Sequence, residues 1–297
     1  MMALPTGLPR GKMRSVSLTD LLAGGGAPTQ VFIVDAGRFT TLIGEKGTRL
    51  TIPAFAWLLP DGQVAEGEIR ITVAELTTKT DIIAAGLATT AEDQLLTAAA
   101  MLQVQVFKGE IPLAPALPID IHWPMANNSF NPLALRLYKA AQATVQPFGA
   151  HALPNLHKVS SRSLPLELIL GQKYLHTQID SCGQWALCTP LPNKHPRMVS
   201  VKYFSIVEDF QEKMAFLVFR DSNAIMRMYE GPHHFTSFNV PSKLFATAVV
   251  IGTQRGKLLL GMAPMDQNKG FSRVYLEETG VQRLADLFRQ VIPAKLH

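Results

Sequence analysis

Strict alternation of apolar and polar residues constrains this chain more than any other feature of its sequence. In the stretch GEIRITVAE, Ile69, Ile71 and Val73 fall on one side of an extended chain, and Glu68 and Arg70 fall on the other. The stretches LQVQVF (102–107), LPIDIHWP (117–124) and LALRLYK (133–139) alternate in the same way. A period of two is typical of half-buried strands in antiparallel sheets. The pattern therefore predicts a mostly-β protein with antiparallel β-sandwich-like domains.

Turn residues and one weakly patterned region divide the predicted strands into two groups. Pro60-Asp61-Gly62 fits a tight turn, because proline presets its own φ and glycine accepts positive φ. Alternation fades over 141–164 and then resumes. We predict a flexible N-terminal segment (1–30), a first β-sandwich domain (31–140), a linker or crossing loop (141–164) and a second β-sandwich-like domain (165–276).

A helix is predicted over 277–292, at the C-terminal end of the sequence. One helical stripe there gathers Val281, Leu284, Leu287, Phe288 and Val291. Pro293 follows, as expected beyond a helix end. Such a helix would cap a sheet edge or pack on a partner.

Composition and charge exclude several classes of protein. Hydrophobic residues make up 47% of the 297 residues and charged residues 17%, a globular balance rather than a disordered one. The net charge is +5, but the basic residues are scattered, so we interpret the charge as a contribution to solubility and expect no nucleic-acid partner. No apolar run is long enough to cross a bilayer, so no transmembrane segment is expected.

The N-terminal residues match a signal peptide poorly, because their apolar stretch is confined to Leu21–Leu22. The compartment therefore stays open. It is cytoplasmic by default, and cell-surface or periplasmic if a signal has been removed.

The stretch 44–76 carries a resemblance to a known family. It combines a Gly-Thr pair, an alternating strand ending in Ile-Pro, an aromatic residue, an Asp-Gly turn, and a Gly before a strand ending in Glu. These are Gly47, Thr48, Leu50, Ile52, Pro53, Phe55, Asp61, Gly62, Gly67 and Glu75. The layout resembles a β-sandwich family common in uncharacterised proteins of the Bacteroidota. It is similar, more distantly, to the sandwich module of ankyrins, netrin receptors and zona-occludens proteins, which also has a late apolar strand ending in proline, here Ile119 to Pro124.

Further segments extend the resemblance over roughly residues 32–263. Asp81, Ile82 and Thr89 match the family's next segment, although Ala100 stands where a glycine is usual before Met101. The second half resembles the companion domain of the same proteins through Gly183, Trp185 and Cys188, with Gln184 inserted and Thr189 in place of an Asp. The resemblance implies a sandwich fold and a non-enzymatic surface or scaffold role, with no catalytic residues.

The stretch GPHHFTSF (231–238) supports the sharpest alternative. Some animal proteins with the related sandwich cut themselves after a His-Phe pair by using the hydroxyl that follows, and this chain offers His234, Phe235 and Thr236. A hydroxyl beside a histidine becomes a nucleophile when a base takes its proton. The simpler interpretation is an ordinary turn entering a strand, in which threonine and phenylalanine alternate.

Candidate ligand sets for a metal are weak. His233 and His234 are adjacent, so on a strand they point to opposite faces. The remaining histidines that we compared, at 122, 151, 157, 176 and 195, have no metal-type spacing with one another. Cys182 and Cys188 could form a disulfide or remain buried thiols, but zinc normally needs a second pair. Glu75 and Asp81 could hold calcium with loop carbonyls, although the dense Asp-x-Asp pattern is missing.

These observations favour a non-catalytic structural or protein-binding module, a scaffold within a larger bacterial assembly or surface system. Exposed sheet edges give such a module a means of binding other proteins or a second copy of itself. We expect no enzymatic activity, no cofactor and no metal. Self-cleavage at His234 and Thr236 is the alternative, and carbohydrate binding through exposed Trp or Tyr on a sandwich face is a third hypothesis.

Overall fold

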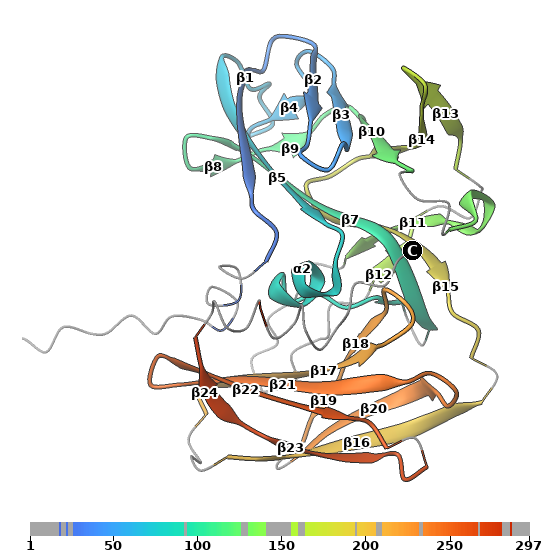
Figure 1. Ribbon diagram of the computed structural model, residues 1–297. Coiled ribbons are helices and arrows are strands. Elements are labelled where there is room, and N and C mark those ends of the chain that lie inside the picture. Colours follow the sequence, from blue (N-terminus) through green and yellow to red (C-terminus); the bar gives the residue numbers. More distant parts are fainter. Residues whose placement is uncertain are drawn as a thin grey trace, which may run out of the picture.

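The structure is a computed structural model that describes residues 18, 22, 26–91, 94–125, 130–140, 156–159, 164–193, 195–205, 210–231, 234–266, 268–280 and 286. Most of these residues lie in strands and few are helical, so the predicted mostly-β class with antiparallel sheets is confirmed. Four large sheets are arranged in two pairs, one above the other in Figure 1.

The first pair of sheets uses strands between Gln30 and Pro190. In spatial order, the larger sheet contains β1 (Gln30–Asp35), β5 (Glu68–Leu76), β7 (Gln94–Lys108), β15 (Gly183–Pro190), β11 (Arg136–Ala140) and β12 (Leu156–Lys158), with β6 (Thr90–Ala91) and β8 (Ile111–Pro112) also paired to β7. The smaller sheet contains β13 (Leu166–Ile169), β14 (Gln172–Ile179), β10 (Ile119–Pro124), β3 (Arg49–Ile52) and β2 (Thr40–Ile43). A separate ribbon pairs β4 (Trp57–Leu58) with β9 (Ala114–Pro115), and a 3₁₀ helix, η1 (Pro132–Ala134), precedes β11.

An apolar layer lies between these two sheets. Ile69, Ile71 and Val73, which alternation places on one face, are all buried in it. The layer also contains the indole rings of Trp57, Trp123 and Trp185. Each large side chain buried in this way stabilises the fold by about 1.5–3 kcal/mol relative to its exposed state.

The second pair of sheets follows in sequence. Its outer sheet contains, in spatial order, β19 (Tyr229–Glu230), β20 (His234–Pro241), β16 (Pro196–Phe204) and β23 (Phe271–Tyr275). Its inner sheet contains β18 (Ile225–Arg227), β17 (Glu212–Phe219), β21 (Ala246–Gln254), β22 (Lys257–Pro264) and β24 (Glu277–Thr279). The pair β16–β23 runs parallel, and a second apolar layer around Leu217, Phe235 and Val250 separates the two sheets.

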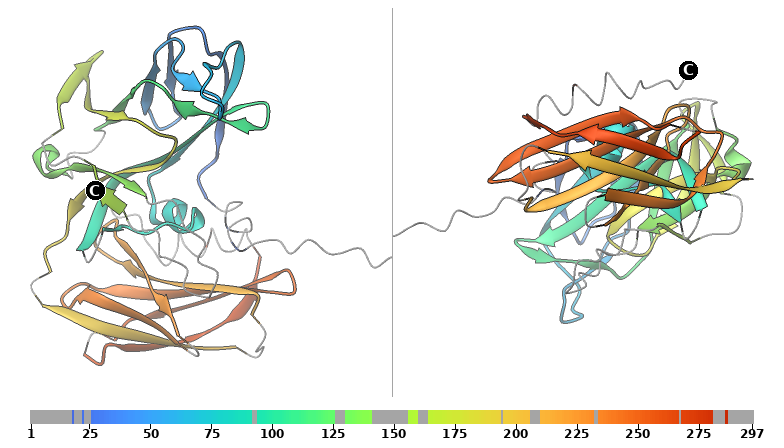
Figure 2. Two further views of the ribbon diagram at one scale, coloured as in Figure 1. Left: turned by 180° about the vertical axis from the view of Figure 1, so that it is seen from behind. Right: turned by 90° about the horizontal axis from the view of Figure 1, so that it is seen from below.

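A third apolar layer joins the two pairs. Along β17, Phe216 belongs to this middle layer, whereas Leu217 belongs to the layer beneath it. Strands covered on both faces are apolar throughout, which explains the unbroken apolar run MAFLVF at 214–219. The short helix α2 (Lys79–Ala84), begun by a capping box at Thr78, places Ile82 and Ile83 in the same layer. The four sheets therefore form one stack (Figures 1 and 2).

Polar contacts run alongside the middle layer. The Lys79 ammonium donates to the carbonyl oxygens of Phe219 and Arg220 at 2.6 and 2.9 Å. Burial lowers the pKa of Lys79 to about 8, against the opposing charge of Asp221. The Asn223 amide donates to the Ala98 carbonyl at 3.0 Å. These bonds fix the position of one pair of sheets against the other.

The predicted boundary at 141–164 does not separate the sheets. Strands β13, β14 and β15 were assigned to the second domain, but β14 pairs with β10 and β15 pairs with β7 and β11. The second pair of sheets begins only at Pro196. The predicted linker also contains a strand, β12, and its residues 141–155 and 160–163 lie outside the described part of the chain.

The two predicted terminal segments also differ from the structure. Glu277–Thr279, the start of the predicted helix, forms β24 and pairs with β22, because the edge of that sheet takes up an extended segment. Of residues 281–292 only Asp286 is described, and its backbone is helical. In the predicted flexible segment 1–30, Leu18 and Leu22 are helical and fully buried in the middle layer. All other residues before 26 lie outside the described part of the chain.

Candidate functional site

The residues of the self-cleavage hypothesis lie on a regular strand. His234 and Thr236 share the outer face of β20, and Phe235 between them is buried. This segment pairs with β16 on one side and with β19 on the other. Among the described residues, no hydrogen bond joins the imidazole of His234 to the hydroxyl of Thr236. The His234 ring packs instead over Gly231, where an added Cβ would lie 2.8 Å from the ring. His233 lies outside the described residues.

The two cysteines are free thiols in different apolar layers. Cys188 is fully buried in the middle layer, and burial raises its pKa far above the usual range. Cys182 packs against the layer of the first pair, and burial raises its pKa to about 11, although a hydrogen bond with the backbone of Val106 opposes the shift. A thiolate is the reactive form of cysteine. Neither position favours a nucleophile, and their separation disfavours a shared metal.

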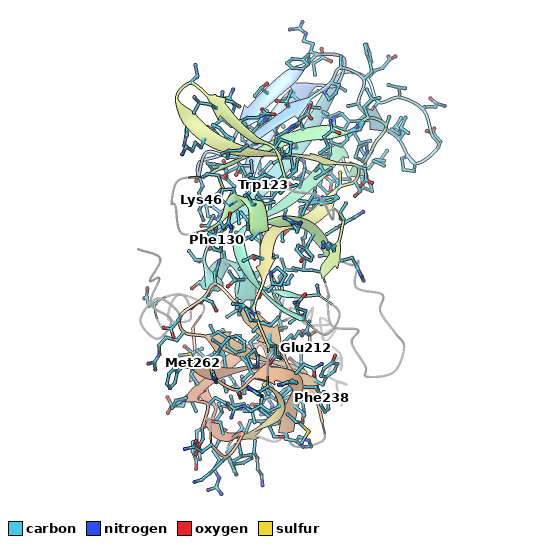
Figure 3. All side chains as sticks on the ribbon, turned by 90° about the vertical axis from the view of Figure 1, so that its right-hand side faces the viewer. Lys46, Trp123, Phe130, Glu212, Phe238 and Met262 are labelled. Atoms are coloured by element: carbon cyan, nitrogen blue, oxygen red, sulfur yellow. The ribbon has the colours of Figure 1, made fainter. Side chains whose placement is uncertain are left out.

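The carboxylates of the calcium hypothesis are already occupied by protein donors. Glu75 is buried, and its oxygens accept from the backbone N–H groups of Lys46 and Thr48 at 2.8 and 3.0 Å and from the Gln30 amide at 3.0 Å. Burial works to raise the pKa of Glu75, but hydrogen bonds from the Thr48 side chain, the Lys46 backbone, the Gln30 amide and the Thr48 backbone outweigh it and lower the pKa. Asp81 caps α2 and pairs with the Lys46 ammonium at 3.3 Å, and Lys46 is labelled in Figure 3. The cluster therefore ties a turn to strand β5.

A cluster that the sequence analysis missed lies on the outer face of the smaller sheet of the first pair. His122 and His176 are cross-strand partners on β10 and β14, and their rings stack at 4.8 Å. Asp120 Oδ1 lies 2.8 Å from His176 Nε2. Glu167 Oε1 and Oε2 lie 3.2 Å from His176 Nδ1 and 3.1 Å from His122 Nε2. We call these four residues the imidazole–carboxylate cluster.

Most polar atoms of the imidazole–carboxylate cluster are paired within it, although His122 Nδ1 is buried with no hydrogen-bond partner among the described residues. Both ring nitrogens of His176 face carboxylate oxygens, so neither is free to bind a metal or to take a proton from a substrate. The Gln178 amide donates to Asp120 at 3.0 Å. Burial works to raise the pKa of Asp120, but the bonds from Gln178 and His176 lower it overall. Within the described residues, no group of three or more His, Cys, Asp or Glu is placed to hold a metal ion.

The outer face of the second pair has a different chemistry. Strand register places Lys202 on β16 between His234 on β20 and Arg273 on β23. All three side chains are exposed, and we call them the cationic row. The next row across the sheet contains Tyr229, Thr236, Ser200 and Phe271, and the row on the opposite side contains Phe204 and Tyr275. Phe238, labelled in Figure 3, lies further along β20 and contacts Tyr229 with 5.9 Å between ring centroids.

A stripe of exposed leucines marks the edge strand β13. The exposed fractions of Leu166, Leu168 and Leu170 are 50%, 70% and 95%. Leu166 and Leu168 alternate with Glu167, so they point away from the imidazole–carboxylate cluster. Leu170 lies in the turn after β13 with φ of +50°, which is uncommon for a residue with a side chain. We call these three residues the leucine stripe.

A cleft of about 520 Å³ opens between the two pairs of sheets. It is lined by Ala91, Gln94, Tyr138, Leu156, Lys158, Asn193, Pro196 and Asn239. Among the described lining residues only Lys158 is charged, and the Asn193 amide is already bonded to the Asn239 carbonyl at 2.6 Å. A catalytic cleft needs convergent ionisable groups. This cleft therefore gives little support to an active site.

No family model matches the chain, and neither a curated protein nor a solved structure is significantly similar to it. The resemblance to the Bacteroidota sandwich family and its companion domain therefore stays a prediction. In the part of the chain that the structure describes, no helix is both long and apolar enough to traverse a bilayer.

Proposed function

We propose that this chain is a non-catalytic protein-binding module that acts as a scaffold component of a larger assembly, and that its contact strand is β13. The leucine stripe on this edge strand is the observation that carries the proposal. Two features of the candidate chemical groups support the non-catalytic part. The thiols are buried with raised pKa values, and the imidazoles of His122 and His176 are held by carboxylates.

Exposure of the leucine stripe to water is unfavourable, and its burial in a contact with another molecule is favourable. Burying one leucine side chain contributes about 1.5–3 kcal/mol. Contiguous exposed apolar residues mark interaction sites more often than scattered ones do. The exposures of Leu168 and Leu170 therefore favour a surface that another molecule covers.

The position of β13 favours a protein as the occupant. β13 ends the strand order of its sheet, so one side of its backbone has no strand partner among the described residues. An extended strand of another chain can pair with such an edge through backbone hydrogen bonds and place its side chains against the leucines. A second copy of β13 can supply this strand in a symmetric dimer.

Light scattering on material separated by size exclusion, combined with pull-down from a cell extract, tests the proposal. The wild type should form an oligomer or retain a specific protein, and Leu168→Glu should be monomeric and bind nothing. Leu133→Glu is the matched control, because Leu133 is 67% exposed but lies in η1. The proposal fails if the wild type is a strict monomer that retains no protein, or if both substitutions act equally.

A further inference from the structure

Three basic residues that are scattered in the sequence meet on one face of the molecule. The cationic row of His234, Lys202 and Arg273 crosses three adjacent strands of the outer sheet in the second pair. Neighbouring strands are about 4.8 Å apart, so the row is about 10 Å long. This sheet faces the viewer in the right-hand view of Figure 2. Basic residues scattered along the sequence gave no reason to expect a nucleic-acid partner, but strand register brings three of them together.

Within the described part of the chain, the cationic row has no counter-charge on its own face of the sheet. Among the described residues of these four strands, none that points outward carries a carboxylate. Glu230 points the other way and pairs with Lys213 at 3.1 Å. The Lys202 ammonium lies over the Phe204 ring, 5.3 Å from its centroid. A polyanion would therefore meet uncompensated positive charge here.

Rings and hydroxyls border the cationic row on both sides. Phe204 and Tyr275 stack on one side, with 5.3 Å between centroids, and Tyr275 is 66% exposed. On the other side lie the hydroxyl groups of Ser200 and Thr236, with Tyr229 and Phe238 beyond them, each a little more than half exposed. Such rings offer apolar faces within reach of the same ligand that the cations would hold.

We propose that this face binds single-stranded nucleic acid, with phosphates on the cationic row and bases against the aromatic rings. Exposed Phe and Tyr beside basic side chains on a sheet suit unpaired bases, which stack on any aromatic ring. A duplex hides its base faces, so the rings would contribute nothing. An acidic polysaccharide needs partners for many hydroxyls. The outward-facing positions of β16, β19, β20 and β23 carry no Asp, Glu, Gln or Asn in regular register, so they serve such a ligand poorly.

Fluorescence anisotropy with labelled oligothymidylate and oligouridylate of about 12 nucleotides tests the proposal. We expect a dissociation constant of about micromolar order at moderate salt. The slope of log K against log salt should be about −1 to −2, as two or three phosphate contacts require. Lys202→Glu with Arg273→Glu should weaken binding at least about tenfold, and Tyr275→Ala or Phe238→Ala should weaken it about fivefold or more.

The control changes net charge equally at another site. Arg38→Glu with Lys173→Glu alters two exposed residues of the first pair and should leave affinity nearly unchanged. Lys202→Gln with Arg273→Gln repeats the test if the glutamate variant shows altered circular dichroism. The proposal is overturned if the control variant loses as much affinity, or if the wild type binds neither probe. It is also overturned if heparin or polyglutamate competes more strongly than unlabelled oligonucleotide. Leu168→Glu should not affect this binding.

Discussion

The outward faces at the two ends of the stack have opposite polar chemistry. On the smaller sheet of the first pair, the two imidazoles and two carboxylates of the imidazole–carboxylate cluster bond to one another. On the outer sheet of the second pair, three basic side chains lie in a row, and no described residue that points outward from this sheet carries a carboxylate. Both faces cover similar sandwich cores, so packing alone does not explain the difference.

This comparison separates polar groups that support the fold from those that are free for a ligand. A side chain whose hydrogen bonds are already made within the protein can be removed only at a cost in stability. A side chain with no such bonds contributes little to folding, and surface substitutions of that kind usually change stability by less than about 0.5 kcal/mol. Substitutions at Glu75, Asp120 and Thr236 should therefore lower the free energy of unfolding by decreasing amounts.

Glu75→Gln should produce the largest loss of stability. The carboxylate of Glu75 accepts from two backbone N–H groups and one amide in a buried position beside the first pair's smaller sheet. The glutamine amide keeps one acceptor oxygen, but its NH₂ group would face N–H donors that the carboxylate oxygen now accepts from. The free energy of unfolding should fall by about 2–4 kcal/mol in chemical denaturation.

Glu68→Gln is the control for that change, because Glu68 is exposed at the start of the same strand. It should alter the unfolding free energy by less than about 0.5 kcal/mol. Equal effects at the two positions would show that the buried carboxylate is not held as described.

Asp120→Asn should have an intermediate, pH-dependent effect. The pKa of Asp120 is lower in the folded protein than in the unfolded chain, so its stabilisation is present above the unfolded value of about 3.9. It is lost as the pH falls through the lower folded pKa. Because the carboxylate is partly exposed, the loss at pH 7 should be about 1 kcal/mol and should disappear near pH 2.

Chemical denaturation curves at about pH 7 and near pH 2 measure this effect. Asp180→Asn is the control, because the Asp180 carboxylate is exposed. A stability difference that persists unchanged at low pH would contradict the role of ionised Asp120.

Thr236→Ala should have the smallest effect. Thr236 lies on the outer face of the second pair, and the structure shows no hydrogen bond from its hydroxyl to another described residue. The unfolding free energy should change by less than about 0.5 kcal/mol. Mass spectrometry of purified wild type and variant should show one intact chain in each case. Two fragments meeting between Phe235 and Thr236 in the wild type alone would support self-cleavage and contradict the non-catalytic proposal.

Local pattern was enough to predict many of the strands but not their partners. It wrongly extended the strand at Arg136 back to Leu133, which lies in η1 and is exposed. Ile69, Ile71 and Val73 are buried where alternation places them, because side-chain direction in a strand depends only on neighbours in sequence. The assignment of 166–190 to the second half was wrong, because pairing is a long-range property. The consecutive apolar residues Trp185 to Cys188 are compatible with a buried strand, but they do not show that β7 lies beside β15.

The candidate sites could not be predicted from the sequence for the same reason. His176 and Asp120 are 56 positions apart, and only the register of β10 with β14 brings them together. Lys202, His234 and Arg273 likewise fall on one row only after two pairings, one of them parallel. The signal in the sequence was the polar residue at every second position, such as Asp120 and His122, which marked an outward face without identifying its neighbours.

The middle apolar layer has a consequence for how such a protein can be inherited. A gene fragment encoding only the strands from β16 onward would leave Phe216, Val249 and Ile251 facing water. A newly synthesised chain of that kind would tend to aggregate through this exposed apolar surface. Recombination can therefore move this architecture between genes only as a whole, and selection acts on the two halves as one heritable unit.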